Sequence, residues 1–106
     1  TEEAYTPLNT VRQRAGLSPL SGLSKNDFRK AVYQETRVEL AFENQRWFDL
    51  LRTGRAIEVM VVHGAEEKAR LARVGAESYN VQEYMLVFPI PASEVRLNGY
   101  NQNPNY

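Results

Sequence analysis

The chain of 106 residues contains no cysteine and a single histidine. The lack of cysteine excludes disulfides, thiolate metal sites and a cysteine nucleophile. Thirteen basic and thirteen acidic side chains cancel, so the net charge gives no basis for nucleic-acid binding. No apolar run approaches the roughly 18 residues that a membrane span needs. The first residues, "TEEAYT", lack the basic and apolar regions of a signal peptide.

What is present is an ordinary globular composition, with 42% hydrophobic and 25% charged residues. These values argue against wholesale disorder, and the length suits one domain with a modest core. The sequence has no glycine-rich phosphate loop, no Gly-x-Ser-x-Gly elbow and no paired cysteine or histidine motif. An enzyme is therefore the weaker hypothesis, and we expect no cofactor.

Helix signals dominate the first half of the chain. A first helix is predicted from Thr6, with Pro7 in its first position, and Gly16 should end it while Leu17 folds back in a Schellman-type ending. A second helix should start at Ser24, which can cap it. Because nothing breaks the pattern before Gly54, this helix is predicted to span about 30 residues.

The sequence predicts a mainly α fold in which these two helices form an antiparallel, tetratricopeptide-like hairpin over residues 6–54. Residues 55–62 are ambiguous between helix and strand, and His63 and Gly64 are expected to interrupt them. A short helix over residues 65–75 should follow, with acids first and bases last. Residues 86–106 are predicted as an extended, Pro-rich tail in which residues 92–98 form a helical turn and Tyr100 and Tyr106 dock onto the helices.

The predicted long helix carries two stripes at about 100° per residue. One is a narrow ridge suited to packing against the first helix: Tyr33, Thr36, Leu40, Trp47 and Leu51. The other mixes large apolar groups with charges: Phe28, Val32, Glu35, Glu39, Phe42, Glu43, Arg46, Asp49 and Leu50. The carboxylates at positions 39 and 43 are a like-charge i,i+4 pair, so Arg46 and another cation are expected beside them.

Three interpretations of the mixed stripe are open. A metal site would need histidine among the carboxylates, but His63 lies beyond the helix-ending glycine, so no metal is expected. A catalytic pair among Glu35, Glu39 and Asp49 would need a pocket without a cation beside it. The third and favoured interpretation is a structural set of ion pairs, because most buried ion pairs are structural. No catalytic residue is therefore assigned.

Aromatic side chains offer a weaker hint of ligand binding. Trp47 could stack on a sugar ring, but its place on the packing ridge favours a core role. Tyr79 and Tyr84 could contact a ligand, although a scaffold role is the default. The binding residues stay unknown at this point.

Three segments carry a family resemblance: "NTVRQRAGL", "ETRVELAFENQRWFDLLRTGR" and the ending "FPIPASEVRLNGYNQNPNY". Their order and content resemble the C-terminal part of SusD/RagB-family proteins over residues 9–58 and 86–106, whereas residues 59–85 match nothing. The family's Glu-x-x-x-Glu-Leu and Phe-Glu-x-x-Arg patterns correspond to residues 35–40 and 42–46, and its Asp-Leu-x-Arg pattern to residues 49–52. These positions look architectural in the family. Two departures are Thr36, where the family usually has Arg, and Asn44, where it often has Gly.

The resemblance implies an outer-membrane, cell-surface lipoprotein of Bacteroidota that binds an oligosaccharide or another nutrient and is not an enzyme. It also implies a SusC-like TonB-dependent transporter as partner and a lipid anchor outside this sequence. Residues 1–106 are thus expected to be a C-terminal scaffold fragment: a hairpin (6–54), a variable segment (55–85) and a tail (86–106). The alternative is a free-standing helical module that binds a protein partner through the mixed stripe.

Overall fold

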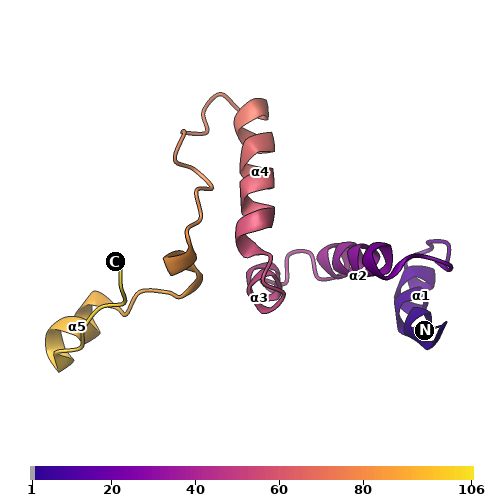
Figure 1. Ribbon diagram of the computed structural model, residues 1–106, viewed down its shortest axis with the longest axis horizontal. Coiled ribbons are helices and arrows are strands. Elements are labelled where there is room, and N and C mark those ends of the chain that lie inside the picture. Colours follow the sequence, from indigo (N-terminus) through magenta and orange to yellow (C-terminus); the bar gives the residue numbers. More distant parts are fainter. Residues whose placement is uncertain (1) are drawn as a thin grey trace. The chain divides into compact units, whose positions relative to one another are not determined.

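The computed structural model describes residues 2–106, and within them every regular element is helical (Figure 1). The mainly α class is therefore confirmed. The chain divides into two compact units, the first ending at Arg46 and the second running from Trp47 to Tyr106. The helices are η1 (Glu2–Ala4), α1 (Tyr5–Arg14), α2 (Lys25–Glu39), α3 (Arg46–Arg52), α4 (Ala56–Arg70), η2 (Glu83–Leu86) and α5 (Ala92–Asn98).

Helix α1 ends as the sequence predicts. Gly16 adopts a φ of 74°, which its missing Cβ permits. Its N–H donates to the Gln13 carbonyl at 3.0 Å, and the Leu17 N–H donates to the Arg12 carbonyl at 2.8 Å. These two bonds constitute a Schellman motif, so the predicted ending is confirmed.

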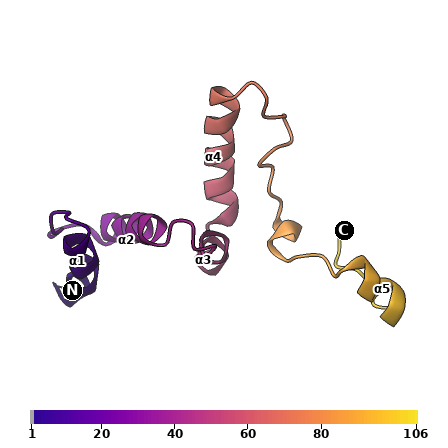
Figure 2. The same cartoon turned by 180° about the vertical axis from the view of Figure 1, so that it is seen from behind.

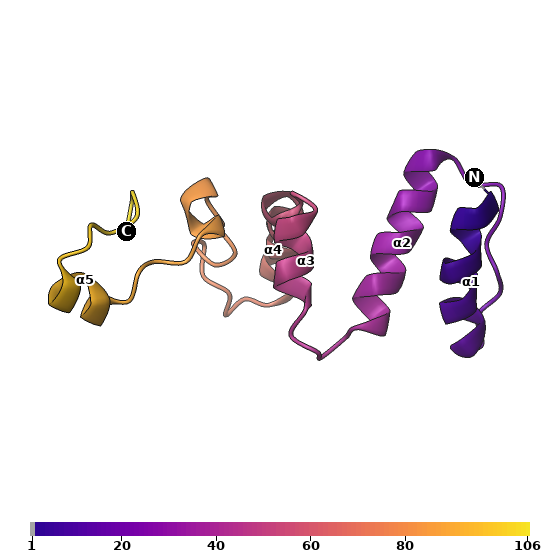
Figure 3. The ribbon, with the colours of Figure 1, turned by 90° about the horizontal axis from the view of Figure 1, so that it is seen from below.

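The linker after α1 returns along the helix that precedes it, as Figure 3 shows. The amide of Asn9 binds Leu20, and the Tyr5 hydroxyl accepts from the Leu23 N–H at 2.8 Å. The linker thus brings the start of α2 back to the start of α1, where the rings of Tyr5 and Phe28 lie 4.7 Å apart edge to face. The two helices form the predicted neighbouring pair, but they run in the same direction, which corrects the antiparallel expectation.

Helix α2 begins at the predicted cap. The Ser24 hydroxyl oxygen accepts from the Asp27 N–H at 3.1 Å, and the hydroxyl donates to the Asp27 carboxylate at 2.7 Å. That second bond, followed by the Lys30 ammonium, lowers the pKa of Asp27. The start of the helix therefore has a satisfied backbone donor and a stabilised negative charge at its positive end.

The predicted 30-residue helix is wrong, because α2 stops at Glu39 and α3 starts only at Arg46. Between them Phe42 and Asn44 have φ values of 69° and 58°. Left-handed backbone at two positions cannot continue a right-handed helix. Asn tolerates this conformation, whereas a bulky aromatic does so only under strain. The two sequence stripes are consequently divided between the two units.

Helix α3 ends in a second Schellman motif, also as predicted. Gly54, at φ 67°, donates to Leu51 at 3.0 Å, and Arg55 donates to Leu50 at 2.9 Å. Leu50 and Ala56 on either side of this turn are only 3% and 2% exposed. The turn therefore lies against the small core of the second unit.

Helix α4 continues through His63 and Gly64, which corrects the expected interruption. In the ambiguous segment 55–62, this helix includes residues 56–62 and Arg55 precedes its first turn, and it ends at Arg70 rather than near the predicted Gly75. After it the chain turns back along α4 (Figures 1 and 2) and places Tyr79 on Gly64. A Cβ added at Gly64 would lie 2.5 Å from the Tyr79 Cβ. Glycine is therefore needed here for a close approach, at a cost to helix propensity of about 1 kcal/mol.

The C-terminal segment folds onto itself, which revises the expectation of a tail lying across the helices. The Gln102 amide binds both backbone polar groups of Ile90, and the Asn103 amide donates to the Phe88 carbonyl at 2.9 Å. The Tyr106 hydroxyl donates to the Val87 carbonyl at 2.9 Å. Residues 92–98 form α5, as the sequence predicts, and Gly99 ends it at φ 67°. The prolines of this segment thus lie in a loop closed by side chains.

Few side chains are fully covered. Among the described residues the buried hydrophobic side chains are Leu8, Leu50 and Ala56. Large apolar groups are exposed in both units, and Phe42 is completely so. A chain of this length usually builds one contiguous core, so these units leave much apolar surface available to further protein. None of the helices formed by residues 2–106 has the length and apolar character to cross a bilayer.

Candidate functional site

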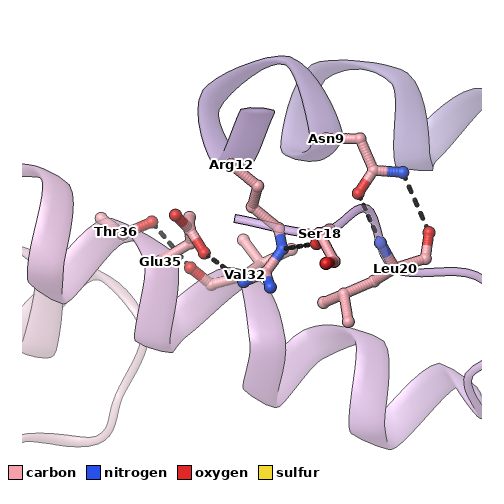
Figure 4. Close-up of polar contacts among 7 residues, drawn as sticks. All are labelled: Asn9, Arg12, Ser18, Leu20, Val32, Glu35 and Thr36. Atoms are coloured by element: carbon pink, nitrogen blue, oxygen red, sulfur yellow. Dashed lines mark hydrogen bonds and ion pairs between the residues drawn. The ribbon is translucent and has the colours of Figure 1, made fainter. Parts of the chain in front are cut away.

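The best-defined cluster of charged and polar side chains lies between α1 and α2 (Figure 4). The guanidinium of Arg12 donates from Nη1 to the Glu35 carboxylate at 2.8 Å and from Nε to the Ser18 carbonyl at 3.0 Å. Both charged side chains are largely covered, at 19% and 12% exposure. Arg12 therefore joins three segments at once: α1, the linker and α2.

A second ion pair, between Arg14 and Glu39, lies one helical turn further along. It is more exposed than the first, at 67% for the arginine and 31% for the carboxylate. Exposed pairs contribute little, typically below about 1 kcal/mol. The stabilising part of this seam is therefore the Arg12–Glu35 pair.

Beside these ion pairs the two helices enclose an apolar groove with a volume of about 440 Å³. The Thr36 hydroxyl at its wall donates back to the Val32 carbonyl at 2.9 Å. Glu35 and Glu39 also line it, but their carboxylates bind the two arginines. The remaining lining is apolar: Ala4, Pro7, Leu8, Val11, Phe28, Val32 and Leu40.

This geometry bears on the three interpretations of the charged stripe. Within residues 2–106, no cluster of three or more His, Asp or Glu side chains is placed to hold a metal ion. Glu35 and Glu39 share a groove, but each has a cation beside it. Asp49 belongs to the second unit, where Arg52 binds it at 3.1 Å. The structural ion-pair interpretation therefore fits, with Arg12 and Arg14 as the cations that pair with Glu35 and Glu39.

The aromatic candidates have structural partners. Tyr79 packs on Gly64 and lies edge to face against His63, at 5.2 Å between ring centroids. His63 is therefore a helical packing residue, not the turn residue its neighbouring glycine suggested. Tyr84 lies 5.1 Å from the ring of Tyr106, also edge to face. Tyr106 thus docks onto the segment before α5, whereas Tyr100 is 57% exposed.

Trp47 does not share a helix with Tyr33, because the turn after α2 separates them. It lies half-buried on α3, in the second unit. The predicted packing ridge is thus split. Trp47 is thus partly covered, and none of the ring pairs found among residues 2–106 includes it.

Sequence reasoning missed the two amides that organise the loops. Asn9 binds Leu20 through both atoms of its amide, and Gln102 binds Ile90 in the same way. Both residues stand in the segments "NTVRQRAGL" and "NGYNQNPNY" that carry the family resemblance. The position of each amide inside a segment that carries the resemblance was the only available signal.

The fold and the groove together define a small all-helical module whose main seam is held by ion pairs and side-chain amides. Comparison with known proteins identifies its family, since residues 1–106 match the SusD family. The chain therefore belongs to the SusD family.

Two curated relatives come from Formosa agariphila. The chain is 34% identical over 99 residues to SusD-like protein P25, a match covering 90% of this chain and 18% of that protein. It is 30% identical over 114 residues to SusD-like protein P2, covering 100% of this chain and 21% of that protein. The chain thus spans about a fifth of the length of these relatives. No solved structure matches the chain.

Proposed function

We propose that this chain is the C-terminal scaffold of a cell-surface protein that binds an oligosaccharide or a related nutrient. Family membership over residues 1–106 supports the nutrient-binding role. The scaffold assignment rests on one observation: the carboxylates of the groove, Glu35 and Glu39, bind arginines of the same chain. Groups already engaged in this way are unsuited to binding a sugar hydroxyl or to general acid–base catalysis.

The complete protein would act without chemistry of its own, capturing the ligand and passing it to a SusC-like TonB-dependent transporter in the outer membrane. A lipid anchor outside the present sequence would hold it at the cell surface. Binding proteins of this kind need a rigid frame that presents recognition loops. The two units described above would supply part of that frame.

Isothermal titration tests the proposal. The complete gene product is titrated with a panel of glycans, and the 106-residue chain serves as the matched control. We expect heat from at least one glycan with the complete protein and none with the chain alone. Sugar binding by the isolated chain would overturn the scaffold assignment, and turnover of a glycan by the complete protein would overturn the binding-only role.

The apolar groove favours a second candidate, a free-standing helical module that binds a protein partner. Such modules place an amphipathic helix in a hydrophobic groove. The length of the open reading frame separates the two proposals. A frame of about this length would favour the module, and an upstream coding region with a lipobox cysteine would favour the scaffold.

A further inference from the structure

Asn98 and Gly99 form the only Asn-Gly pair in the chain. The pair stands at the end of α5, a helix without a buried residue, and both of its members are exposed. Gly99 adopts a φ of 67°, and apart from its chain neighbours no atom lies within 4 Å of the place that a Cβ would take. The backbone nitrogen of Gly99 is therefore sterically unhindered beside the side-chain amide of Asn98.

An asparagine followed by glycine has a nucleophile in its own backbone. The Gly99 nitrogen attacks Cγ of Asn98, a new C–N bond closes a five-membered imide, and the bond from Cγ to the side-chain nitrogen breaks. Ammonia leaves with the proton that the Gly99 nitrogen gives up. Water then opens one of the two imide carbonyls, which leaves aspartate or isoaspartate at position 98. The reaction consumes water alone and needs no oxidant or cofactor.

The closed last turn of α5 holds this reaction back. The Gly99 N–H donates to the Val95 carbonyl at 3.0 Å, and the Asn98 amide donates to the Glu94 carboxylate at 2.7 Å. Both groups must leave these partners, and the helical backbone of Asn98 must unwind, before the nitrogen reaches Cγ. Because no buried side chain holds α5 in place, such a local opening requires little free energy.

We propose that Asn98 is a site of spontaneous deamidation, that opening of the last turn of α5 sets its rate, and that the product weakens the same turn. The inference rests on the Asn-Gly pair and on the hydrogen bonds around it. It does not require the proposed nutrient-binding role.

The product lacks what holds the parent turn together. A carboxylate at position 98 stands four residues from the Glu94 carboxylate, so a like-charge pair replaces a hydrogen bond. It also places a negative charge at the negative end of the helix dipole. Isoaspartate adds a further carbon to the main chain before Gly99 and displaces its N–H from the Val95 carbonyl. Deamidation therefore loosens the end of α5 irreversibly.

The same segment provides the controls. Asn101 and Asn105 are followed by residues with large side chains, which crowd the attacking nitrogen, and Asn103 is followed by proline, whose nitrogen has no proton to give up. Trypsin cleaves after Arg96, and no Lys or Arg follows up to residue 106. All four asparagines therefore leave in one peptide, where tandem mass spectrometry distinguishes them.

The complete gene product is incubated at mildly alkaline pH, in buffer and in guanidinium chloride, and the conversion of amide to acid is followed. In buffer we expect Asn98 to convert severalfold faster than Asn101 or Asn105. In denaturant Asn98 should convert at least about threefold faster than in buffer, because the hydrogen bonds of the turn no longer have to break. Gly99→Ala should slow the conversion in both solutions, even though alanine strains the turn at this φ.

Asn98→Asp tests the effect of the product's charge. At neutral pH the Gly99 N–H should exchange with solvent about twofold faster in this variant than in the parent protein. Adding Glu94→Gln, which removes the opposing carboxylate, should abolish most of that acceleration.

Conversion of Asn98 no faster than that of Asn101, or none in buffer, would overturn the modification site. Equal rates for Asn98 in buffer and in denaturant would overturn the control by α5. An unchanged exchange rate in Asn98→Asp would overturn the weakening by charge. None of these results bears on the titration with glycans, so the two proposals can fail independently.

Discussion

Each unit contains a side-chain amide that binds both backbone polar groups of one distant residue; we call this arrangement an amide clamp. In the first unit, Asn9 donates to the Leu20 carbonyl at 2.9 Å and accepts from its N–H at 2.8 Å. In the second unit, Gln102 makes the same two bonds to Ile90, both at 2.8 Å. The geometry is shared, but the surroundings differ.

The Asn9 clamp is one of several contacts that hold its linker. Tyr5 binds Leu23 on one side of it, and Arg12 binds Ser18 on the other. The Gln102 clamp holds a segment with prolines at positions 89 and 91, which lack N–H groups and cannot join a regular ladder. The Asn103 amide and the Tyr106 hydroxyl also bind carbonyls of this segment, so both clamps have neighbouring side-chain contacts. The contacts beside Asn9 include the charged Arg12, whereas those beside Gln102 are all uncharged.

The largest effect is expected at Arg12, because its ion pair with Glu35 is largely covered. Arg12→Ala removes the hydrogen bond to Ser18 and leaves Glu35, at 12% exposure, without its partner. We expect a loss of about 3 kcal/mol in the free energy of unfolding, measured by urea denaturation followed by circular dichroism.

The matched control for Arg12 is Arg14→Ala, because that arginine makes the exposed ion pair of the same seam. It should cost below about 1 kcal/mol. An equal loss of unfolding free energy in the two variants would mean that burial does not make the Arg12–Glu35 pair stronger than the Arg14–Glu39 pair.

The amide clamps themselves should rank next. Gln102→Ala removes three hydrogen bonds, since the Gln102 amide oxygen also accepts from the Asn103 N–H, so we expect a local loss of about 2 kcal/mol. Asn9→Ala removes only two, and the contacts of Tyr5 and Arg12 keep the linker in place, so about 1 kcal/mol is expected. Hydrogen exchange of the Ile90 and Leu20 amides measures each loss at its own site. Exchange that accelerates more at Leu20 than at Ile90 would reverse the comparison.

A smaller effect is expected where the returning chain crosses α4. Gly64→Ala should raise helix propensity by about 1 kcal/mol but force Tyr79 aside at about 2 kcal/mol, a net loss of about 1 kcal/mol. In a Tyr79→Gly background the same change should become stabilising. Gly75→Ala is the control, since a Cβ there meets only the Ser78 hydroxyl at 3.8 Å. Thermal unfolding is measured for Gly64→Ala, Tyr79→Gly, the double variant and Gly75→Ala. If Gly64→Ala is equally destabilising with and without Tyr79, then Tyr79 does not require the glycine.

Local signals were the predictable part of this fold. Ser24 and Asp27 indicate the start of α2, and Gly16 and Gly54 indicate the ends of α1 and α3. These signals can be read from the sequence because each motif lies within six consecutive residues. Glu35, Glu39 and Asp49 of the mixed stripe were correctly assigned to ion pairs. Arg12 and Arg14, the partners of Glu35 and Glu39, were not identified, since they lie 23 and 25 residues away along the chain.

The direction of α2 could not be predicted for a similar reason. A ten-residue linker allows α2 to run parallel or antiparallel to α1. The direction depends on the hydrogen bonds that Tyr5 and Asn9 make to the backbone of the linker. The break after Glu39 was missed because Phe42 gives no sign of a left-handed conformation. Asn44 did give such a sign, because the family often has glycine at this position and glycine readily adopts a positive φ. Gly64 was mistaken for a helix end. A glycine is needed there because Tyr79 packs on it, and Tyr79 lies in the segment that returns along α4.

The smallest expected effect concerns the last turn of α4, and it depends on pH. The Arg70 guanidinium donates to both carboxylate oxygens of Glu67, at 2.6 and 3.2 Å, and it lowers the pKa of that carboxylate against the opposing effect of burial. A carboxylate with a lowered pKa in the folded state stabilises the fold above its ordinary pKa, and the contribution is lost as the pH falls through the lowered value.

Glu67→Gln should therefore weaken the end of α4 slightly at neutral pH and make no difference once Glu67 is protonated in the parent chain. Helicity measured by circular dichroism between neutral and strongly acidic pH checks the convergence. Glu66→Gln is the control, because Glu66 is the neighbour of Glu67 in the sequence, is exposed, and takes part in no ion pair in the described structure. A constant gap between the parent and Glu67→Gln at every pH would show that the charge of Glu67 does not stabilise this turn. Arg70 binds its carboxylate through two nitrogens within one turn of α4, whereas Arg12 binds Glu35 through one nitrogen and uses another to bind the Ser18 carbonyl, so only the Arg12 pair joins separate segments.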